Sequence, residues 1–191
     1  MDYRTILGII PVLLAAPSYW LYIRSIFVGK TVPHMYSWLI WSLLAGIGFV
    51  GQVSGDAGPG SWNTGITAVA CFAIFIVAAK KGERHLYVID KILLLVAVAA
   101  IILRVLTSSN EIAVFMATIA ALVGFALTIK KAYHKPSQEN PTTFFINSTR
   151  NFISLFALNS ISFLTFFYPF CMMLANASIL IVIITRKKEN G

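Results

Sequence analysis

The sequence predicts an all-α membrane protein whose seven transmembrane helices form two parallel three-helix repeats joined by a linker helix. Three observations indicate this fold class: an apolar composition, long apolar runs separated by short loops, and an internal repeat. Hydrophobic residues make up 58% of the 191 residues and charged residues 12%, whereas soluble domains hold about 45–50% apolar and roughly 25% charged residues. Lipid must therefore cover much of the molecular surface.

The composition also argues against other classes of protein. The net charge of +8 lies in short loops between apolar runs, where basic residues normally record membrane topology, so we expect no nucleic-acid partner. Cys71 and Cys171 fall within apolar runs, where free cysteine behaves as a small packing residue. The first run follows Arg4 as a signal peptide would, but it continues beyond Pro17, so a retained helix is predicted.

Seven apolar runs can each cross a ~30 Å hydrocarbon core, which needs about 20 helical residues. Helices are predicted because an open strand edge in lipid would leave backbone groups without hydrogen bonds. The predicted spans cover residues 5–26, 34–53, 61–79, 87–106, 111–129, 142–160 and 163–185. The first bundle then comprises residues 1–83, the linker 84–108 and the second bundle 109–191.

The ends of the spans follow from local sequence. The first span ends in a basic hinge after Arg24, and Pro33 opens the second, because proline in the first turn of a helix loses no hydrogen bond. The glycine-rich residues 51–60 predict a turn before the third span. The fourth span, mostly Leu, Val, Ala and Ile, suits a connector that packs against other helices or faces lipid. A second basic hinge joins the fifth span to the sixth and ends at Pro141.

The distribution of basic residues predicts the orientation in the membrane. One side holds only Arg4 and Arg104, so the N-terminus is predicted outside and the C-terminus in the cytoplasm. The very short loops favour a bacterial inner membrane. The predicted cytoplasmic side holds Arg24, Lys30, Lys80, Lys81, Arg84, Lys91, Lys130, Lys131, Lys135, Arg186, Lys187 and Lys188.

The first three spans resemble the last three. A basic residue, a hinge and a proline recur, because Arg24 to Pro33 matches Lys131 to Pro141 within one residue. Three spans and a connector give both units the same orientation, so the repeats are parallel. Transporters built from such repeats hold their substrate near the bilayer midplane, between the two units.

This pattern resembles the SWEET sugar transporters and the wider PQ-loop superfamily. Pro17-Ser18-Tyr19-Trp20 with Ile23 is similar to a stretch of the first SWEET helix, and Lys30-Thr31 with Ser37 is similar to the hinge that follows it. Leu174-Ala175-Asn176 is similar to a motif of half-size bacterial relatives, in which the asparagine touches sugar. Ser18 stands where a PQ-loop protein has glutamine. The resemblance implies a seven-helix sugar transporter.

Four carboxamides are the candidate substrate ligands: Gln52, Asn63, Asn159 and Asn176. An amide both donates and accepts hydrogen bonds, as a sugar hydroxyl does, although a buried amide also forms ordinary bonds between helices. Apolar walls are expected from Phe49, Trp62 and Phe170, and Thr64 or Thr67 is an alternative counterpart of Asn176 in the third span.

Hinge and gate positions are predicted at Pro17, Tyr19, Pro33, Pro141 and Arg150. Proline removes helical hydrogen bonds and can kink a helix. Arg150 would cost roughly 2.5–3.5 kcal/mol if it faced lipid in the middle of a span. It is therefore expected either to line a water-filled vestibule or gate, or to extend to the cytoplasmic surface.

The ionisable residues favour neither an enzyme nor a proton-coupled carrier. No acidic residue lies deep within a span, and His34, His85 and His134 fall in or beside loops with no metal-site spacing. We expect no cofactor, no metal and no catalytic residue.

The sequence thus predicts a facilitator that carries a small polar uncharged solute, a sugar, by alternating access. A non-transporting membrane receptor, or an assembly or lipid-handling partner on the same fold, is the alternative. The solute and the lipid bilayer are the expected partners, and the sequence is also compatible with a homo-oligomer.

Overall fold

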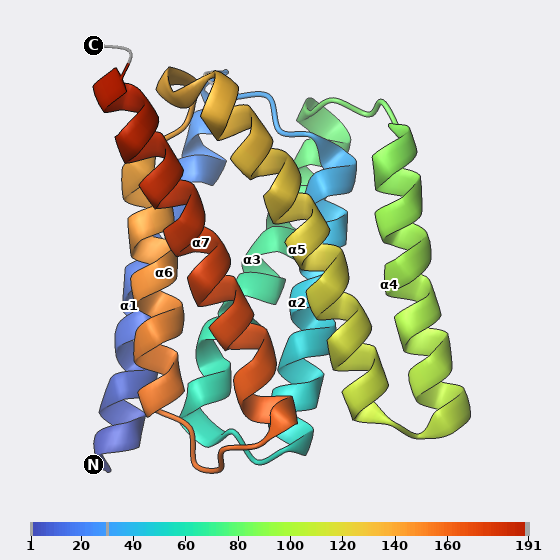
Figure 1. Cartoon of the computed structure of the whole chain (residues 1–191). Helices are drawn as coiled ribbons and strands as arrows, with labels where there is room; N and C mark the ends of the chain where they lie inside the picture. The colour runs from blue at the N-terminus through green and yellow to red at the C-terminus, as the bar shows by residue number, and fades with distance from the viewer. Residues whose placement is uncertain (1, 30, 190–191) are drawn as a thin grey trace.

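The computed structural model describes residues 2–29 and 31–189 (Figure 1). Lys30, part of the first predicted hinge, lies outside the described residues. Strands are absent from the described part of the chain, in which an isolated bridge joins His34 to Glu83. The elements are α1 (Tyr3–Phe27), α2 (Met35–Ser54), the 3-10 helix η1 (Gly58–Ser61), α3 (Trp62–Lys81), α4 (Val88–Thr107), α5 (Asn110–His134), the 3-10 helix η2 (Pro136–Gln138), α6 (Pro141–Phe156) and α7 (Phe163–Glu189).

Each predicted span coincides with one of the α-helices that the structure describes. The fifth extends beyond its predicted end at Ile129, because α5 continues to His134, and the sixth is shorter than predicted. The sequence predicts that this span reaches Ser160, but α6 ends at Phe156. The reason is a contact with the loop after α2, in which the backbone N–H of Asn159 donates to the carbonyl of Ala57 at 3.1 Å. Ala57 and Ala157 are fully buried there, so the chain leaves the helix in order to pack on this loop.

Five helical segments are long and apolar enough to cross a membrane: Tyr3–Phe27, Met35–Ser54, Gly58–Lys81, Asn110–His134 and Phe163–Lys187. The helix α4 is also apolar but has Asp90 and Lys91 in its first turn and Arg104 in its last. The helix α6 has 16 residues, which span about 24 Å at ~1.5 Å per residue. By length and composition these five segments are compatible with an integral membrane protein.

Six of the helices form a closed ring in which each packs on two neighbours. In order around the ring, α1 is followed by α3, α2, α5, α7 and α6, and α6 packs back on α1. The helix α4 stands outside the ring and packs on α2 and α5, as Figure 1 shows. Across the ring, α2 also contacts α7, and α3 contacts α6.

Small side chains line many of the helix contacts, and large apolar ones face outward. Ala45, Ala97, Ala117 and Ala121 are at most 1% exposed, and small residues let membrane helices approach closely. Outward-facing apolar residues include Leu13, Trp20, Val69, Leu95, Leu106 and Ile181. An apolar surface of this kind is compatible with contact to lipid.

The connections alternate between the two ends of the bundle, and α1 begins at the end opposite to that where α7 finishes (Figure 1). At the end where α7 finishes, the loop before α2 is hydrogen-bonded to the loop after α3. Met35 N–H donates to the Glu83 carbonyl, and Glu83 N–H donates to the Pro33 carbonyl, both at 2.9 Å. A Cβ at Gly82 would lie 2.3 Å from the Pro33 carbonyl oxygen, so glycine permits this close approach.

Candidate functional site

The polar face of α6 points into the ring. Asn147, Arg150, Asn151 and Ser154 recur at intervals of three and four residues, which places them on one face of a helix. Arg150 and Ser154 are buried, while the three phenylalanines of this helix that face outward are exposed. The segment that is most polar in sequence is therefore turned away from lipid.

Arg150 is the centre of the candidate site. Its side chain is 2% exposed, so it neither faces lipid nor extends to the surface. The Nε–H donates to Asn63 Oδ1 at 3.1 Å, and Nη2 donates to Thr67 Oγ1 at 3.1 Å. Both acceptors belong to α3. On its own helix, Nη1 donates to Asn147 Oδ1 at 3.3 Å.

Two further residues complete what we call the Arg150 cluster. Asn151 accepts a hydrogen bond from Asn63 Nδ2 at 3.1 Å and donates to the Asn147 carbonyl at 2.9 Å. From α1, the Tyr19 ring centroid lies 5.6 Å from Arg150 Cζ, within the range of a cation–π contact. The cluster consists of Tyr19, Asn63, Thr67, Asn147, Arg150 and Asn151.

The charge of Arg150 has no counter-ion within the described part of the chain. Its partners there are two amide oxygens, the Thr67 hydroxyl and the Tyr19 side chain. The close contacts between carboxylates and basic side chains among the described residues lie elsewhere, with Asp90 near His34 and Glu139 near Lys131. Arginine stays charged in proteins, and burying a charge costs several kcal/mol unless it is paired. The site is therefore a neutral polar shell around a buried cation.

The structure brings four predicted site residues together: the proposed ligands Asn63 and Thr67 and the proposed gate residues Tyr19 and Arg150. The other carboxamides have separate partners. Asn176 is 4% exposed and donates to the Met172 carbonyl of its own helix at 2.7 Å. No hydrogen bond joins any two of the four predicted carboxamides to each other within residues 2–29 and 31–189.

Gln52 stabilises a carbonyl that α7 itself cannot satisfy. Its Nε2 donates to the Thr165 carbonyl at 3.2 Å. In an α-helix this carbonyl would accept from the N–H of residue 169, but that residue is Pro169 and proline has no N–H. Gln52 is fully buried, and its Oε1 has no hydrogen-bond partner. The amide thus has a structural role that its sequence position does not reveal.

The remaining predicted positions lie nearer the ends of the helices. Asn159 is exposed in the loop after α6, and Trp62 is 39% exposed as the first residue of α3. Phe49 is half-buried and packs over Gly65 of α3. Pro141 is the first residue of α6, following the N-cap Asn140.

Of the other two predicted hinge prolines, Pro17 lies within the continuous helix α1. Pro33 precedes the N-cap His34 of α2 and so lies just outside the helix that it was expected to open.

Two cavities lie outside the ring, between α4 and the α2–α5 pair. One has a volume of about 210 Å³ and is lined by residues including Ser37, Trp41 and Asp90. The other has a volume of about 320 Å³ and is lined by residues including Val50 and Arg104. Neither cavity includes a predicted site residue, and in this conformation the members of the Arg150 cluster bond to one another.

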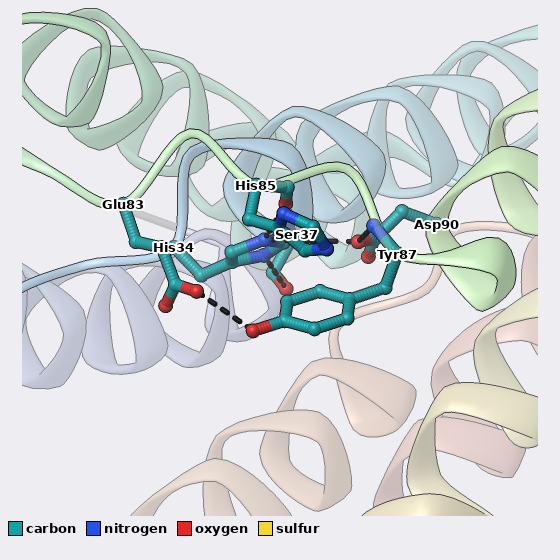
Figure 2. Close-up of polar contacts among 6 residues, drawn as sticks. All are labelled: His34, Ser37, Glu83, His85, Tyr87 and Asp90. Carbon is teal, nitrogen blue, oxygen red and sulfur yellow. Dashed lines mark hydrogen bonds and ion pairs between the residues drawn. The ribbon is translucent and has the colours of Figure 1, made fainter.

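A second polar cluster, which sequence reasoning missed, lies where the loop before α2 meets the loop between α3 and α4 (Figure 2). His34 Nδ1 accepts a hydrogen bond from Ser37 N–H and lies 2.8 Å from Ser37 Oγ. Its Nε2 lies 2.7 Å from the His85 carbonyl oxygen, which can only accept. His34 is therefore protonated on Nε2 and caps α2 through Nδ1.

The same cluster connects the loop after α3 to the start of α4. Asp90 is 5% exposed, accepts from Tyr87 N–H at 3.0 Å and lies 3.6 Å from His34 Nε2. Tyr87, an exposed residue just before α4, donates its hydroxyl to Glu83 Oε1 at 2.7 Å. This bond and the carboxylate charge raise the pKa of Tyr87 above its ordinary value.

The His34–Ser37 pair resembles a base beside a nucleophile, but its geometry is that of a helix cap. The spacing of three residues between a capping side chain and its N–H partner is a local signal that could have identified it. Elsewhere in the described chain, no three His, Cys, Asp or Glu side chains gather closely enough to hold a metal ion.

No family model, curated protein or solved structure matches this chain. The function must therefore be inferred from the residues of the chain itself.

Proposed function

We propose that the protein is a membrane transporter that facilitates passage of a small polar solute by alternating access. On the evidence of the sequence and of its resemblance to SWEET transporters, an uncharged sugar is the first solute to test. The helices would cross the membrane seven times, as two parallel three-helix units joined by α4.

The contacts around the ring support this arrangement. In the first unit α3 packs between α1 and α2, and in the second α7 packs between α5 and α6. The units meet where α1 contacts α6 and where α5 contacts α2. If α1, α2 and α3 correspond to α5, α6 and α7, the contact of α1 with α6 corresponds to the contact of α5 with α2. This is the pattern expected of two repeats related by an axis along the membrane normal.

The single observation that carries the proposal is the Arg150 cluster. Arg150 belongs to the second unit, whereas its partners Asn63, Thr67 and Tyr19 belong to the first. An ionisable residue inside a membrane protein generally marks a functional site. Alternating access requires contacts between the units to form and break, and the neutral acceptors around Arg150 can be replaced by solute hydroxyl groups.

The orientation of the proposed transporter follows from the ends of the helices. At one end of the described bundle the basic side chains are Arg4 and Arg104, and most of the others lie at the end with the two hinges. We place the hinge end in the cytoplasm of a bacterial cell, because cytoplasmic loops are rich in Lys and Arg.

Transport is tested with the full chain in proteoliposomes, by counterflow of radiolabelled D-glucose. Thr67→Val removes the acceptor of Arg150 Nη2, and Thr118→Val is its matched control. Both hydroxyls donate to a backbone carbonyl four residues earlier, at 2.8 Å for Thr67 and 2.7 Å for Thr118, but Thr67 also accepts from Arg150.

We expect Thr67→Val to lower counterflow by about 10-fold, since a hydrogen bond to a charged group contributes about 1.5–3 kcal/mol. Thr118→Val should leave counterflow within about 2-fold of wild type, because the loss of a hydroxyl away from Arg150 has a small effect. Equal effects of the two substitutions on counterflow would show that Thr67 is not part of the solute site.

The second candidate is a non-transporting membrane receptor or assembly partner. The observation in its favour is that the Arg150 cluster is closed, while the two cavities lie outside the ring. Disulfide cross-links between the two units distinguish the candidates: they would abolish counterflow through a transporter.

A further inference from the structure

We propose that the solute held at the Arg150 cluster carries one carboxylate in addition to its hydroxyl groups, and that the Arg150 guanidinium binds this carboxylate. The inference rests on the proposed transport function and refines its solute, from a neutral sugar to a polyhydroxy acid. It depends on the charge, the donor geometry and the location of Arg150.

The first step concerns charge. Arg150 is 2% exposed, and the acceptors that surround it in the described structure are all uncharged. Ionisable residues within membrane spans face the bundle interior or a water-filled cavity, pair with one another or with backbone carbonyls, and mark substrate paths. Since none of the described carboxylates is its partner, an anionic group from outside the chain is the missing counter-charge.

The second step concerns the donors. A guanidinium has five N–H groups, and three of them have acceptors here: one each on Nε, Nη1 and Nη2. The Tyr19 side chain also interacts with the guanidinium, so the partners of Arg150 in the described structure are all uncharged. The planar fork of a guanidinium binds the two oxygens of a carboxylate in a bidentate manner, and such charged bonds are stronger than neutral ones.

The third step concerns the kind of anion. A single guanidinium balances a single negative charge, whereas a phosphate monoester carries about −1.5 to −2 at neutral pH. The rest of the cluster consists of the amides and hydroxyls of Tyr19, Asn63, Thr67, Asn147 and Asn151. These groups donate to and accept from hydroxyl groups, so a hydroxylated monocarboxylate fits them better than a phosphate does.

The fourth step concerns movement. Arg150 joins α6 to α3, and these helices belong to different units of the proposed transporter. A carboxylate that binds the guanidinium competes with the neutral acceptors Asn63 and Thr67. Binding of the solute and release of the contact between the units are thereby the same event, as alternating access requires.

The test uses the full chain in proteoliposomes whose membrane potential is clamped to zero with potassium and valinomycin. Counterflow of radiolabelled D-gluconate is compared with that of D-glucose, for wild type and for Arg150→Gln, Arg150→Lys and Arg24→Gln. Arg24 is the matched control, since it is an exposed arginine at the end of α1 and loses the same charge far from the cluster.

We expect wild type to carry gluconate at least about 10-fold faster than glucose. Arg150→Gln should lower gluconate counterflow by about 10- to 100-fold, the range of charge-assisted hydrogen bonds. Arg150→Lys should be intermediate, because lysine keeps the charge but not the planar fork. Arg24→Gln should match wild type.

Each contrary result has a distinct meaning. If glucose crosses and gluconate does not, the inference of a carboxylate on the solute is wrong, whereas the proposed transport function stands. If neither crosses, the transport function fails and the inference fails with it. If inorganic phosphate competes as well as unlabelled gluconate, the carboxylate class is wrong. The comparison of solutes and competitors on wild type decides these outcomes even if the Arg150 variants do not fold.

Discussion

Gln52 and Pro169 lie on different helices, but both determine the hydrogen bonding of one carbonyl group, that of Thr165. Pro169 deprives the Thr165 carbonyl of its helical donor, and Gln52 Nε2 replaces that donor at 3.2 Å. The amide of Gln52 therefore satisfies the backbone, whereas the amide of Asn63 binds a charged side chain. Two buried carboxamides of the same apparent kind have different roles because their neighbours differ.

This linkage predicts a double-mutant cycle. Gln52→Met should lower the free energy of unfolding by about 1–3 kcal/mol, since it leaves the Thr165 carbonyl without a donor. In a Pro169→Ala background the N–H of residue 169 is restored, so the same substitution should cost much less. Thermal unfolding of the four proteins in detergent measures the coupling. Equal costs of Gln52→Met in both backgrounds would refute the linkage.

The limits of sequence reasoning are visible in the same residues. Apolar runs of about 20 residues predict helices because the bilayer sets their length, and all seven are present. The contact of Arg150 with Asn63 joins residues far apart in the chain, and only helix packing decides which amide it finds. The amide of Asn176, which fits the sugar motif in sequence, bonds to its own helix. The cap at His34 had a local signal, because its partner Ser37 is three residues away.

At the scale of elements, His34 connects two loops that are distant in sequence. Through Nδ1 it caps α2, and through Nε2 it reaches the His85 carbonyl in the loop before α4 (Figure 2). The imidazole ring thereby holds the hinge between α1 and α2 against the end of α3.

His34→Ala should release this hinge, and His85→Ala should not. The first substitution removes both hydrogen bonds of the ring, at a cost of about 1 kcal/mol for the cap alone. The second keeps the backbone carbonyl that His34 contacts and loses only the ring contact with Tyr87. Hydrogen–deuterium exchange of residues 33–37 and 82–87 should therefore speed up in His34→Ala only. Faster exchange in His85→Ala to the same degree would show that the ring contact, not the cap, holds the loops.

At the scale of the whole molecule, the number of membrane crossings depends on α4 and α6. Among the described residues five segments are long and apolar enough to cross a membrane, whereas α4 has charges near its ends and α6 is short. A path of seven crossings requires that the loops before and after each of these helices lie on opposite sides of the membrane.

Cysteine labelling of intact cells tests this topology. In a background of Cys71→Ala and Cys171→Ala, we expect Ser108→Cys to react with an impermeant maleimide from outside. Arg84→Cys and Lys135→Cys should react only after permeabilisation, because they lie at the cytoplasmic end in a seven-span path. External labelling of both Arg84→Cys and Ser108→Cys would mean that α4 does not cross.

The position of α4 outside the ring has a mechanical consequence. This helix rests on α2 and α5 together, one from each unit, and the spaces of about 210 and 320 Å³ lie beneath it. In the proposed transporter, a tightly packed α4 would resist movement of the two units relative to each other, since close-packed interfaces resist sliding. If the two units move as the proposed transporter requires, these spaces would leave room for α2 and α5 to shift beneath α4, and filling them with larger side chains should slow transport.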